Sequence, residues 1–512
     1  MDVRFARHLK EDHLVLTLSS PVKMRLPASL GLRAQECLTF TDMRADWAYR
    51  KFKAGERWFV KKNTRQAFEE RLEQLKADRV KNLLFWDDGG YWTYSGLQAL
   101  LRQEFQEVVA TPYPLTEPAL IPWATAPNKV PRYYQTEAVE ALMEAAKFGP
   151  AGVEIGTGLG KTLCIIMLLK RLGLKTVIMA PSTSIAVQIY DELVTCFGKA
   201  KVGFFGGGKK EFKKLFTVGI AASLRNVTEG TPAWDCLSRA DVFIADESHL
   251  CPAETLSKVC FGLVENAAYR FFFSGTQMRG DGLDLLLDAI TGPIVYRMTV
   301  AEGIERGFLA QINFRMCWLE SNVKDKDGNL LSLADANDMT RAHVYYNPEL
   351  NAKAAEIANK AVSLMGRKTM ILVDELAQFT HLLPHLRYEA RFAHGGVTKD
   401  NKSELPEAYH ESDPKQLVAD FCAGKFPILV GTSCIVMGTD IPDVRCILYL
   451  RAGKSETEVK QGVGRLTRLA PGKVDGIFID FGISNVPVLE KHALARKKLY
   501  SEIYPSYSEV CI

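Results

Sequence analysis

Two short runs of residues combine the types and the spacing that are needed to bind and cleave a nucleoside triphosphate. The first run is Gly156-Thr157-Gly158-Leu159-Gly160-Lys161-Thr162. Glycines let successive backbone N–H groups turn toward phosphates, while a lysine reaches the β and γ oxygens and the following hydroxyl ligates Mg²⁺. The next residues, 163–169, are apolar and predict a helix whose N-terminus would face the anion. The run therefore predicts a phosphate-binding loop, although the strict pattern has a glycine where Ile155 stands.

An acidic pair follows a short apolar stretch later in the chain. The stretch Val242–Ala245 predicts a strand, and it ends in Asp246-Glu247-Ser248-His249. A carboxylate at a strand tip can hold Mg²⁺ through water, and the next carboxylate can orient and deprotonate the attacking water. Alone, such a pair is more often a solvated turn. Because it follows a phosphate loop, we interpret it as the second half of an ATPase site.

The second run lies closer to the C-terminal end of the sequence and reads Gln461-Gly462-Val463-Gly464-Arg465-Leu466-Thr467-Arg468. Fixed guanidinium groups can stabilise the charge that develops on a leaving γ-phosphoryl group. Arginines at this spacing more commonly belong to a solvated helix face. The glutamine and glycines in the same run, together with the upstream motifs, favour a catalytic role for Gln461, Arg465 and Arg468.

Alternating strand and helix patterns predict the elements that position these residues. Apolar strand candidates lie at Thr176–Ala180, Val202–Phe205, Val218–Ala221, Val242–Ala245 and Phe271–Phe273, and again at Met370–Val373, Ala390–Ala393, Ile428–Val430, Cys446–Leu450 and Gly476–Ile479. Such alternation is typical of a parallel sheet with helices on both faces. We therefore expect an α/β fold with two parallel-sheet domains, at 132–315 and 316–485, and a C-terminal tail at 486–512.

The residues before these domains have a different pattern. A strand at Leu14–Leu18, a helix between Thr64 and Val80 and a hairpin at Leu84–Tyr94 predict a small α+β module over residues 1–110. Closely spaced prolines then predict an extended linker at 111–131.

The N-terminal module contains a basic and aromatic segment. Between Arg44 and Arg65, lysines and arginines alternate with tryptophan, tyrosine and phenylalanine. Aromatic rings can stack on unpaired bases while cations follow phosphates, so Arg57, Trp58 and Lys61 are candidate nucleic-acid ligands. The alternative is that the aromatic residues form the core of a small domain whose surface is basic.

The bulk composition sets wider limits. A formal net charge of +4 permits a polyanionic partner but does not establish one. The 11 cysteines include no Cys-x-x-Cys pair and are typical of reduced thiols in a cytosolic protein. No segment resembles a signal peptide or an apolar membrane span, so we expect a soluble cytoplasmic protein that binds no membrane.

With these motifs in order, the chain resembles the superfamily 2 helicases and translocases over about residues 130–480. Further segments fall where that family has its motifs. By this resemblance, Arg132 and Gln135 read adenine, Gly438 and Asp440 sense the nucleotide, and His249, Ser274 and Thr276 couple hydrolysis to motion. The resemblance also assigns contacts with the nucleic-acid backbone to the residues Pro181, Ser182, Thr183, Thr432 and Ser433. It implies two RecA-like motor domains, with ATP and Mg²⁺ as cofactors.

A narrower resemblance concerns the segment Phe273–Gly282, which is similar to the Thr-Ala-Thr-Pro-x-Arg-x-Asp-Gly stretch of double-stranded-DNA translocases, although Gln277 replaces the proline. With Ala301–Leu309 and the separate N-terminal module, the chain looks most like phage recombination and branch-migration helicases of the UvsW type. This implies a monomeric, ATP-dependent motor that unwinds or remodels branched DNA in a bacterium or a phage-infected host. Single-stranded DNA and RNA are further partners to consider. The alternatives are an RNA helicase, a non-catalytic nucleic-acid clamp and the motor subunit of a larger restriction or defence complex.

Overall fold

The computed structural model describes residues 14–511 except 57–58, 61–62, 128–129, 249–252, 276–283, 334, 398–401, 433–434, 436–440, 442, 454–458, 460–462, 464–465, 468, 471–472, 474 and 504–506. The chain divides into two compact units, one formed by Met1–Ile155 with Gly160–Met298 and the other by Gly156–Leu159 with Thr299–Ile512. Among the described helices, none is long and apolar enough to cross a membrane.

The first unit begins with a five-stranded sheet in the order β5-β6-β2-β1-β7. Its strands are β5 (Phe85–Asp87), β6 (Gly90–Tyr94), β2 (Lys23–Arg25), β1 (Leu14–Leu18) and β7 (Val108–Ala110), with α1 (Ala28–Ala34), η2 (Ser95–Leu97) and α5 (Gln98–Glu104) against them. The predicted strand at Leu14–Leu18 and the predicted hairpin are confirmed, because β5 and β6 pair across a tight turn in which Asp87 faces Gly90.

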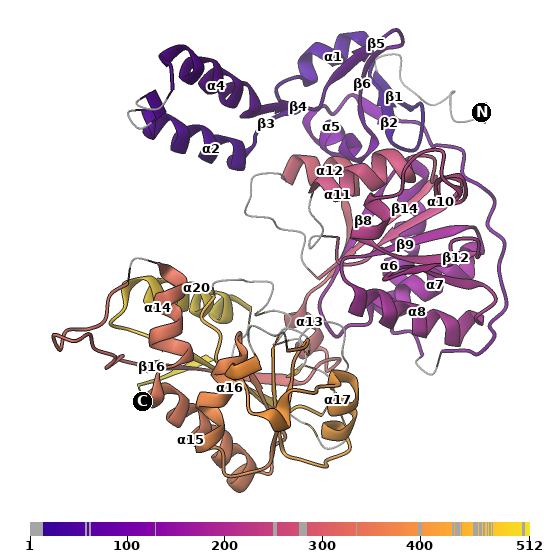
Figure 1. Cartoon of the computed structure of the whole chain (residues 1–512). Helices are drawn as coiled ribbons and strands as arrows, with labels where there is room; N and C mark the ends of the chain where they lie inside the picture. Colours follow the sequence, from indigo (N-terminus) through magenta and orange to yellow (C-terminus); the bar gives the residue numbers. More distant parts are fainter. Residues whose placement is uncertain are drawn as a thin grey trace. The chain divides into compact units, whose positions relative to one another are not determined.

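A helical hairpin is inserted into this module. Helices α2 (Met43–Ala54) and α4 (Arg65–Asp78) lie between β3 (Thr39–Thr41) and β4 (Val80–Asn82), which pair as a separate two-stranded ribbon. Thr64 caps α4 by accepting a hydrogen bond from the Ala67 amide, which confirms the predicted helix start. The hairpin is joined to the rest of the module through the ribbon (Figure 1).

The larger sheet of the first unit has eight strands in the order β11-β10-β12-β9-β13-β14-β8-β15. They are β11 (Lys209–Lys210), β10 (Val202–Gly206), β12 (Phe216–Ile220), β9 (Thr176–Ala180), β13 (Val242–Ala245), β14 (Tyr269–Ser274), β8 (Ala151–Ile155) and β15 (Ile294–Met298). All neighbouring strands are parallel except β10 and β11. The central strands are buried along their whole length, which is why they read as unbroken apolar runs in the sequence.

The helices of this sheet are α6 (Tyr133–Ala145), α7 (Lys161–Leu172), α8 (Thr183–Phe197), α9 (Ala221–Arg225), α10 (Pro232–Leu237), α11 (Ala253–Lys258) and α12 (Asp284–Thr291). The proline-rich segment runs over this domain in extended form. Its backbone amides at Tyr113, Ala119 and Ala124 donate to carbonyls of the domain, and Trp123 packs its ring against Phe197 at 5.3 Å. The segment is therefore fastened to the domain at several points.

The second unit is built on a parallel sheet in the order β18-β19-β17-β20-β21-β16-β22. Its strands are β18 (Ala390–Ala393), β19 (Ile428–Gly431), β17 (Thr369–Leu372), β20 (Cys446–Tyr449), β21 (Asp475–Ile483), β16 (Gln311–Leu319) and β22 (Tyr507–Cys511). Its helices include α13 (Val300–Glu305), α14 (Ala336–Thr340), the π-helical turn η6 (Arg341–Tyr345), α15 (Pro348–Met365), α16 (Leu376–Leu382), α17 (Pro414–Cys422) and α20 (Pro487–Ile503).

Two segments of this unit fall differently from the domain limits expected from the sequence. Strand β16 spans residue 315 and pairs along its length with β21, so residues 311–319 belong to the second sheet. The residues after 485 form α20 and β22, and β22 pairs in parallel with β16. The Tyr500 ring of α20 stacks on Phe314 of β16, with centroids 4.8 Å apart, which ties this segment into the domain core.

Candidate functional site

Four of the predicted motifs follow adjacent strands of the eight-stranded sheet. The phosphate loop follows β8, the acidic pair follows β13, Ser274 ends β14 and Pro181 follows β9. The order β9-β13-β14-β8 makes these strands neighbours. Because the strands are parallel, their carboxyl ends meet at one edge of the sheet, where ligands of open α/β sheets bind. The fold therefore brings these motifs together, as the sequence predicts.

The phosphate loop has the backbone conformation that its glycines permit. Gly158 has a φ of 87° and Gly160 a φ of 83°, and both values lie in the left-handed region that favours glycine. Helix α7 begins at Lys161, so its first amides open toward the loop. A side chain at Gly160 would meet the Gln135 amide, because a Cβ there would lie 2.5 Å from Gln135 Nε2. Gln135 thus closes one side of the loop.

Lys161 and Glu247 form an ion pair at the centre of this edge. Lys161 Nζ lies 2.9 Å from Glu247 Oε1 and 3.3 Å from the Ile155 carbonyl oxygen. The other carboxylate oxygen of Glu247 accepts a hydrogen bond of 3.3 Å from the Gly275 amide. Glu247 has a φ of 46°, the only positive φ among the non-glycine residues that the structure describes. Such a conformation costs on the order of 1–3 kcal/mol and is typical of functional sites.

Asp246 has the character of a cation ligand. Its side chain is buried, and its Oδ1 atom has no hydrogen-bond partner among the described residues. Burial and then the neighbouring Glu247 carboxylate raise the pKa of Asp246 well above its usual range. An orphaned, buried carboxylate oxygen is costly unless a ligand compensates it. The site therefore fits Mg²⁺, which Asp246 and the Thr162 hydroxyl in the first turn of α7 would hold.

The charge on Lys161 is secured by the two carboxylates. Burial by itself lowers the pKa of Lys161, but Glu247 and Asp246 outweigh this effect, and the pKa is raised overall. The lysine is therefore a fixed cation at the place where the β and γ oxygens of a nucleotide are expected.

A second link joins the acidic loop to β14. The Ser248 hydroxyl donates to the Phe273 carbonyl at 3.5 Å, and Ser274 at the end of the strand is fully buried. Together with the Gly275 amide, this contact couples Glu247 to the segment that the sequence assigns to hydrolysis coupling. Gly275 and Ser248 belong to the motifs that the sequence predicts, but the sequence does not predict that the Gly275 amide and the Ser248 hydroxyl make these contacts.

The other predicted residues of the first unit lie near this edge or at helix starts. Gln135 Oε1 accepts from the Arg132 amide at 2.8 Å, and Gln135 Nε2 donates to the Gly160 carbonyl at 3.4 Å. Ser182 caps α8 by accepting from the Ile185 amide, and Pro181 and Thr183 flank it. In the second unit, Thr432 follows β19 and donates its amide to the Ala393 carbonyl.

Several predicted residues lie outside the described part of the chain: Arg57, Trp58, Lys61, His249, Thr276, Ser433, Gly438, Asp440, Gln461, Arg465 and Arg468. Their roles stay predictions.

The basic and aromatic segment of the N-terminal module divides into a core and a surface. Phe52 of α2 stacks on Phe68 of α4 with centroids 5.0 Å apart, and Phe59 packs against both rings. These rings form the interior of the hairpin, as expected if the aromatic residues are the core of a small domain. Trp47 is instead 63% exposed, with Lys51 Nζ 4.7 Å from its ring centroid.

Two family models match the chain in tandem. Residues 128–279 match the model described as "Type III restriction enzyme, res subunit", and residues 353–470 match "Helicase conserved C-terminal domain". These matches cover the phosphate loop and the acidic pair in one segment and the glutamine–arginine run in the other.

Individual proteins that are similar to this chain include helicases and translocases. The "Probable helicase D10" of Escherichia phage T5 is 26% identical over 63% of this chain and 65% of its own length. The "DNA 3'-5' translocase XPB2" of Sulfurisphaera tokodaii is 22% identical over 66% of this chain and 78% of its own length. A solved fragment of a putative HsdR subunit of a type I restriction enzyme from Vibrio vulnificus has a TM-score of 0.52 at 19% identity, over 75% of this chain and 69% of the fragment. This likeness confirms the predicted α/β fold class.

The region that this chain shares with the first three curated relatives spans 65%, 63% and 53% of their own lengths.

Proposed function

The chain belongs to the superfamily 2 helicases, and from this premise we propose that it is an ATP-dependent DNA helicase or translocase. Its proposed substrates are forks, Holliday junctions and displacement loops, which it unwinds or remodels in recombination, replication or repair. The observation that carries the proposal is the arrangement of Lys161, Asp246 and Glu247 at one sheet edge, with the Gly275 amide on the Glu247 carboxylate.

The proposed chemistry follows from what these residues can do. Bound ATP with Mg²⁺ would supply the γ-phosphoryl group and its charge-neutralising cation. Lys161 would exchange its Glu247 partner for the phosphate oxygens, which releases the carboxylate to accept a proton from the attacking water. Asp246 and Thr162 would hold the cation, and Arg465 and Arg468 are proposed as the arginine fingers. Such a finger is worth on the order of 10³–10⁵ in rate.

The choice of DNA rests on resemblance in the motifs. The segment 273–282 is similar to that of double-stranded-DNA translocases, and one relative is named as a DNA translocase. The backbone-contacting loops would bind phosphates and sugars, which positions a strand without reading its sequence. The UvsW-type assignment, and with it branched DNA as the substrate, rests on this segment and on the presence of the N-terminal module before the first motor domain.

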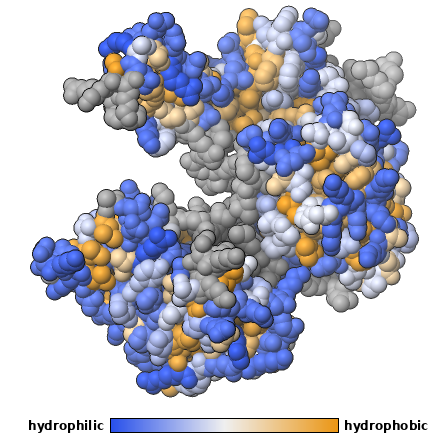
Figure 2. Space-filling view, in the orientation of Figure 1, coloured by the Kyte–Doolittle hydropathy of each residue, from blue (hydrophilic) through white to orange (hydrophobic). Residues whose placement is uncertain are grey.

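The exposed side of the helical hairpin is a proposed contact for DNA. Its surface is largely hydrophilic (Figure 2), and Trp47 with Lys51 offers a ring and a cation to a base and a phosphate. Replacing Trp47 by alanine should weaken binding to forked DNA about fivefold without lowering the thermal midpoint. Phe52→Leu, which alters the interior of the hairpin, should do the reverse. Equal fork binding by Trp47→Ala and the parent protein would assign the hairpin a structural role.

The decisive test measures steady-state ATP hydrolysis at low salt with no nucleic acid, duplex DNA, branched DNA, single-stranded DNA or RNA. We expect the strongest stimulation by branched DNA. Stimulation by RNA alone would contradict the DNA assignment, and no hydrolysis under any condition would contradict the ATPase.

A second candidate is the motor subunit of a larger restriction complex. It is favoured by the restriction-enzyme family model over residues 128–279 and by the HsdR likeness. It predicts stimulation by linear duplex DNA without preference for branches, which the same assay distinguishes.

A further inference from the structure

The N-terminal module shares a hydrophobic core with the first motor domain. Leu97 and Leu101 of the module and Ala289 of α12 are all buried in one cluster, and Leu285 and Leu286 of α12 pack against it. The approach is closest at Gly96, where a Cβ would lie 2.3 Å from the Asp288 carbonyl oxygen and 2.5 Å from that of Ala289. A side chain cannot be inserted there without moving α12.

The module also touches a second element of that domain. The ring of Tyr94, at the end of β6, stacks on the ring of Phe261 with centroids 4.1 Å apart and an interplanar angle of 10°. Phe261 lies on the π-helical turn η5 (Val259–Leu263). Turns of this kind are rare and recur at functional sites.

A buried arginine fixes this turn to β14. Arg270, which is 1% exposed, donates to the Cys260 and Val264 carbonyls, each at 2.8 Å. These carbonyls would otherwise be buried polar groups at an irregular helix end. Arg270 therefore bonds η5 to strand β14, which ends at Ser274. Phe261 of η5 is the residue that stacks on Tyr94.

Both elements under the module continue from the catalytic edge. Along the chain, α11 and η5 come after the acidic pair, and α12 comes after Ser274 and Gly275. The chain segment that leads to α11 and the one that leads to α12 begin beside each other at the catalytic edge, where the Gly275 amide donates to Glu247 Oε2. Helices α11 and α12 also pack against each other. One surface of the module contacts both η5 and α12, and we call it the docking face. It consists of Tyr94, Ser95, Gly96 and Leu97.

We propose that the docking face of the N-terminal module is a positioning surface for Glu247, which fixes the two segments that set the Gly275–Glu247 contact. The module then has a part in ATP turnover that is separate from any contact it makes with nucleic acid. Tyr94 and Phe261 are the positioning residues. This inference rests on the proposed ATPase, in which Glu247 activates the water.

The test compares Tyr94→Leu and Phe261→Leu with Trp123→Leu. The control variant, Trp123→Leu, loses an aromatic contact with Phe197, which is the last residue of α8 and belongs to neither η5 nor α12. In the two docking-face variants we expect kcat for ATP to fall about tenfold, with KM for ATP changed by less than about twofold. Rates are referred to active sites counted by nucleotide binding. Tyr94→Phe, which keeps the ring, should restore the parent kcat.

A second readout does not need turnover. Hydrogen exchange of peptides that contain Glu247 and Gly275 should quicken about tenfold in Tyr94→Leu and stay unchanged in Trp123→Leu. Unchanged exchange in Tyr94→Leu, or equal quickening in Trp123→Leu, would overturn the proposal. If the parent protein hydrolyses no ATP, the proposed function fails while exchange still decides the positioning role. If the parent turns over and Tyr94→Leu matches it in both readouts, only the positioning role fails.

Discussion

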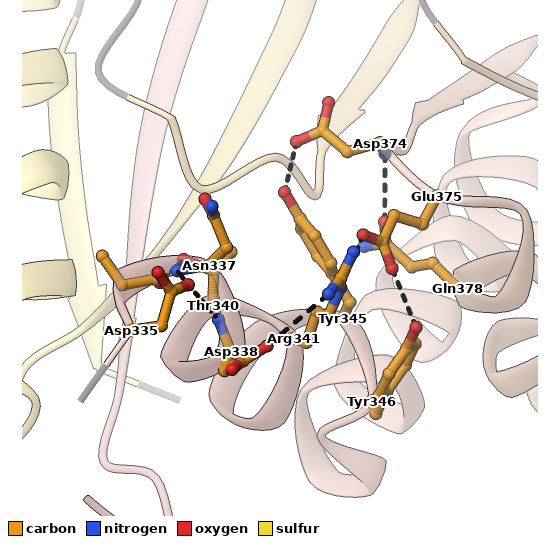
Figure 3. Close-up of polar contacts among 11 residues, drawn as sticks. Asp335, Asn337, Asp338, Thr340, Arg341, Tyr345, Tyr346, Asp374, Glu375 and Gln378 are labelled. Carbon is orange, nitrogen blue, oxygen red and sulfur yellow. Dashed lines mark hydrogen bonds and ion pairs between the residues drawn. The ribbon is translucent and has the colours of Figure 1, made fainter. Parts of the chain in front are cut away.

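Each of the two large parallel sheets carries an acidic pair where a central strand ends, and the two pairs are bonded differently. At the end of β13, Asp246 keeps an oxygen without a partner among the described residues, and Glu247 pairs with Lys161. At the end of β17, Asp374 accepts from the Tyr345 hydroxyl at 2.6 Å and pairs with Arg451 at 2.6 Å. Its neighbour Glu375 accepts from Tyr346 and from Arg341, each at 2.8 Å (Figure 3).

The difference shows that the strand edge alone does not make a reactive site. In the second sheet, two tyrosine protons and two guanidinium groups saturate the carboxylates. Burial and then the adjacent carboxylates raise the pKa of Tyr345 well above its usual range and that of Tyr346 to about 12, so both hydroxyls stay donors. In the first sheet, the recorded partners of Glu247 are Lys161 and the Gly275 amide, and the proposed function has Lys161 turn to phosphate instead. The second pair is held by bonds within its own domain, whereas the first pair is the one that we propose to bind a ligand.

The largest effect is expected from Lys161→Ala. The variant loses the cation that faces the phosphate oxygens, so ATP turnover should fall by about 10³-fold or more. It also removes the positive charge beside the buried Asp246 and the partly buried Glu247, which should destabilise the unit by about 3 kcal/mol. Steady-state hydrolysis and urea unfolding measure the two effects. Lys147→Ala, at an exposed lysine paired with Glu144, is the matched control and should change neither. Near-normal turnover in Lys161→Ala would remove the first pair from catalysis.

Glu247→Gln should separate binding from chemistry. The amide keeps the side-chain shape and still accepts from the Gly275 amide, but it no longer takes a proton from water. Nucleotide binding should persist while hydrolysis falls by about 10²–10⁴-fold. Fluorescent nucleotide titration and single-turnover hydrolysis measure the two quantities, and Glu254→Gln, at an exposed residue of α11, is the control. Loss of nucleotide binding along with hydrolysis would argue against the base role.

Asp374→Asn tests the other half of the comparison. The change removes the negative charge that Asp374 presents to the guanidinium of Arg451, which is 5% exposed. We expect a loss of about 2 kcal/mol in the free energy of unfolding, with nucleotide affinity unchanged. Asp338→Asn, at a mostly exposed carboxylate near Arg341, should stay within about 0.5 kcal/mol of the parent. A variant of full stability with impaired nucleotide binding would show that the second edge also serves a ligand.

The sequence predicts the role of the acidic pair after β13 but not the bonds of the pair after β17, and the reason is physical. Buried central parallel strands are nearly continuous apolar runs, so Thr176–Ala180 and Val242–Ala245 could be placed to the residue. The phosphate loop and the acidic pair are local patterns with fixed chemistry. The bonds of Tyr345 to Asp374 and of Tyr346 to Glu375 join residues 29 positions apart, and no local pattern records them.

Other features depend on tertiary contacts in the same way. Strand β22 lies at the edge of its sheet, and polar Ser508 and Glu509 interrupt it, so it gives no apolar run. Phe52 and Phe59 could have been a stacking surface or a core, and only the position of Phe68 decides for the core. The contact of Glu247 with the Gly275 amide uses the backbone, which the sequence does not specify.

The smallest effect is expected from Tyr346→Phe, which removes one of the donors to Glu375 and leaves Arg341. Arg341 still neutralises the carboxylate, so the loss should be about 1 kcal/mol in the free energy of unfolding, with ATP turnover unchanged. A double-mutant cycle with Glu375→Gln isolates the hydroxyl–carboxylate bond and should give a coupling of about 1 kcal/mol. A coupling of zero would mean that this carboxylate is not held by its tyrosine, and the contrast between a saturated and an open edge would then rest on Asp374 alone.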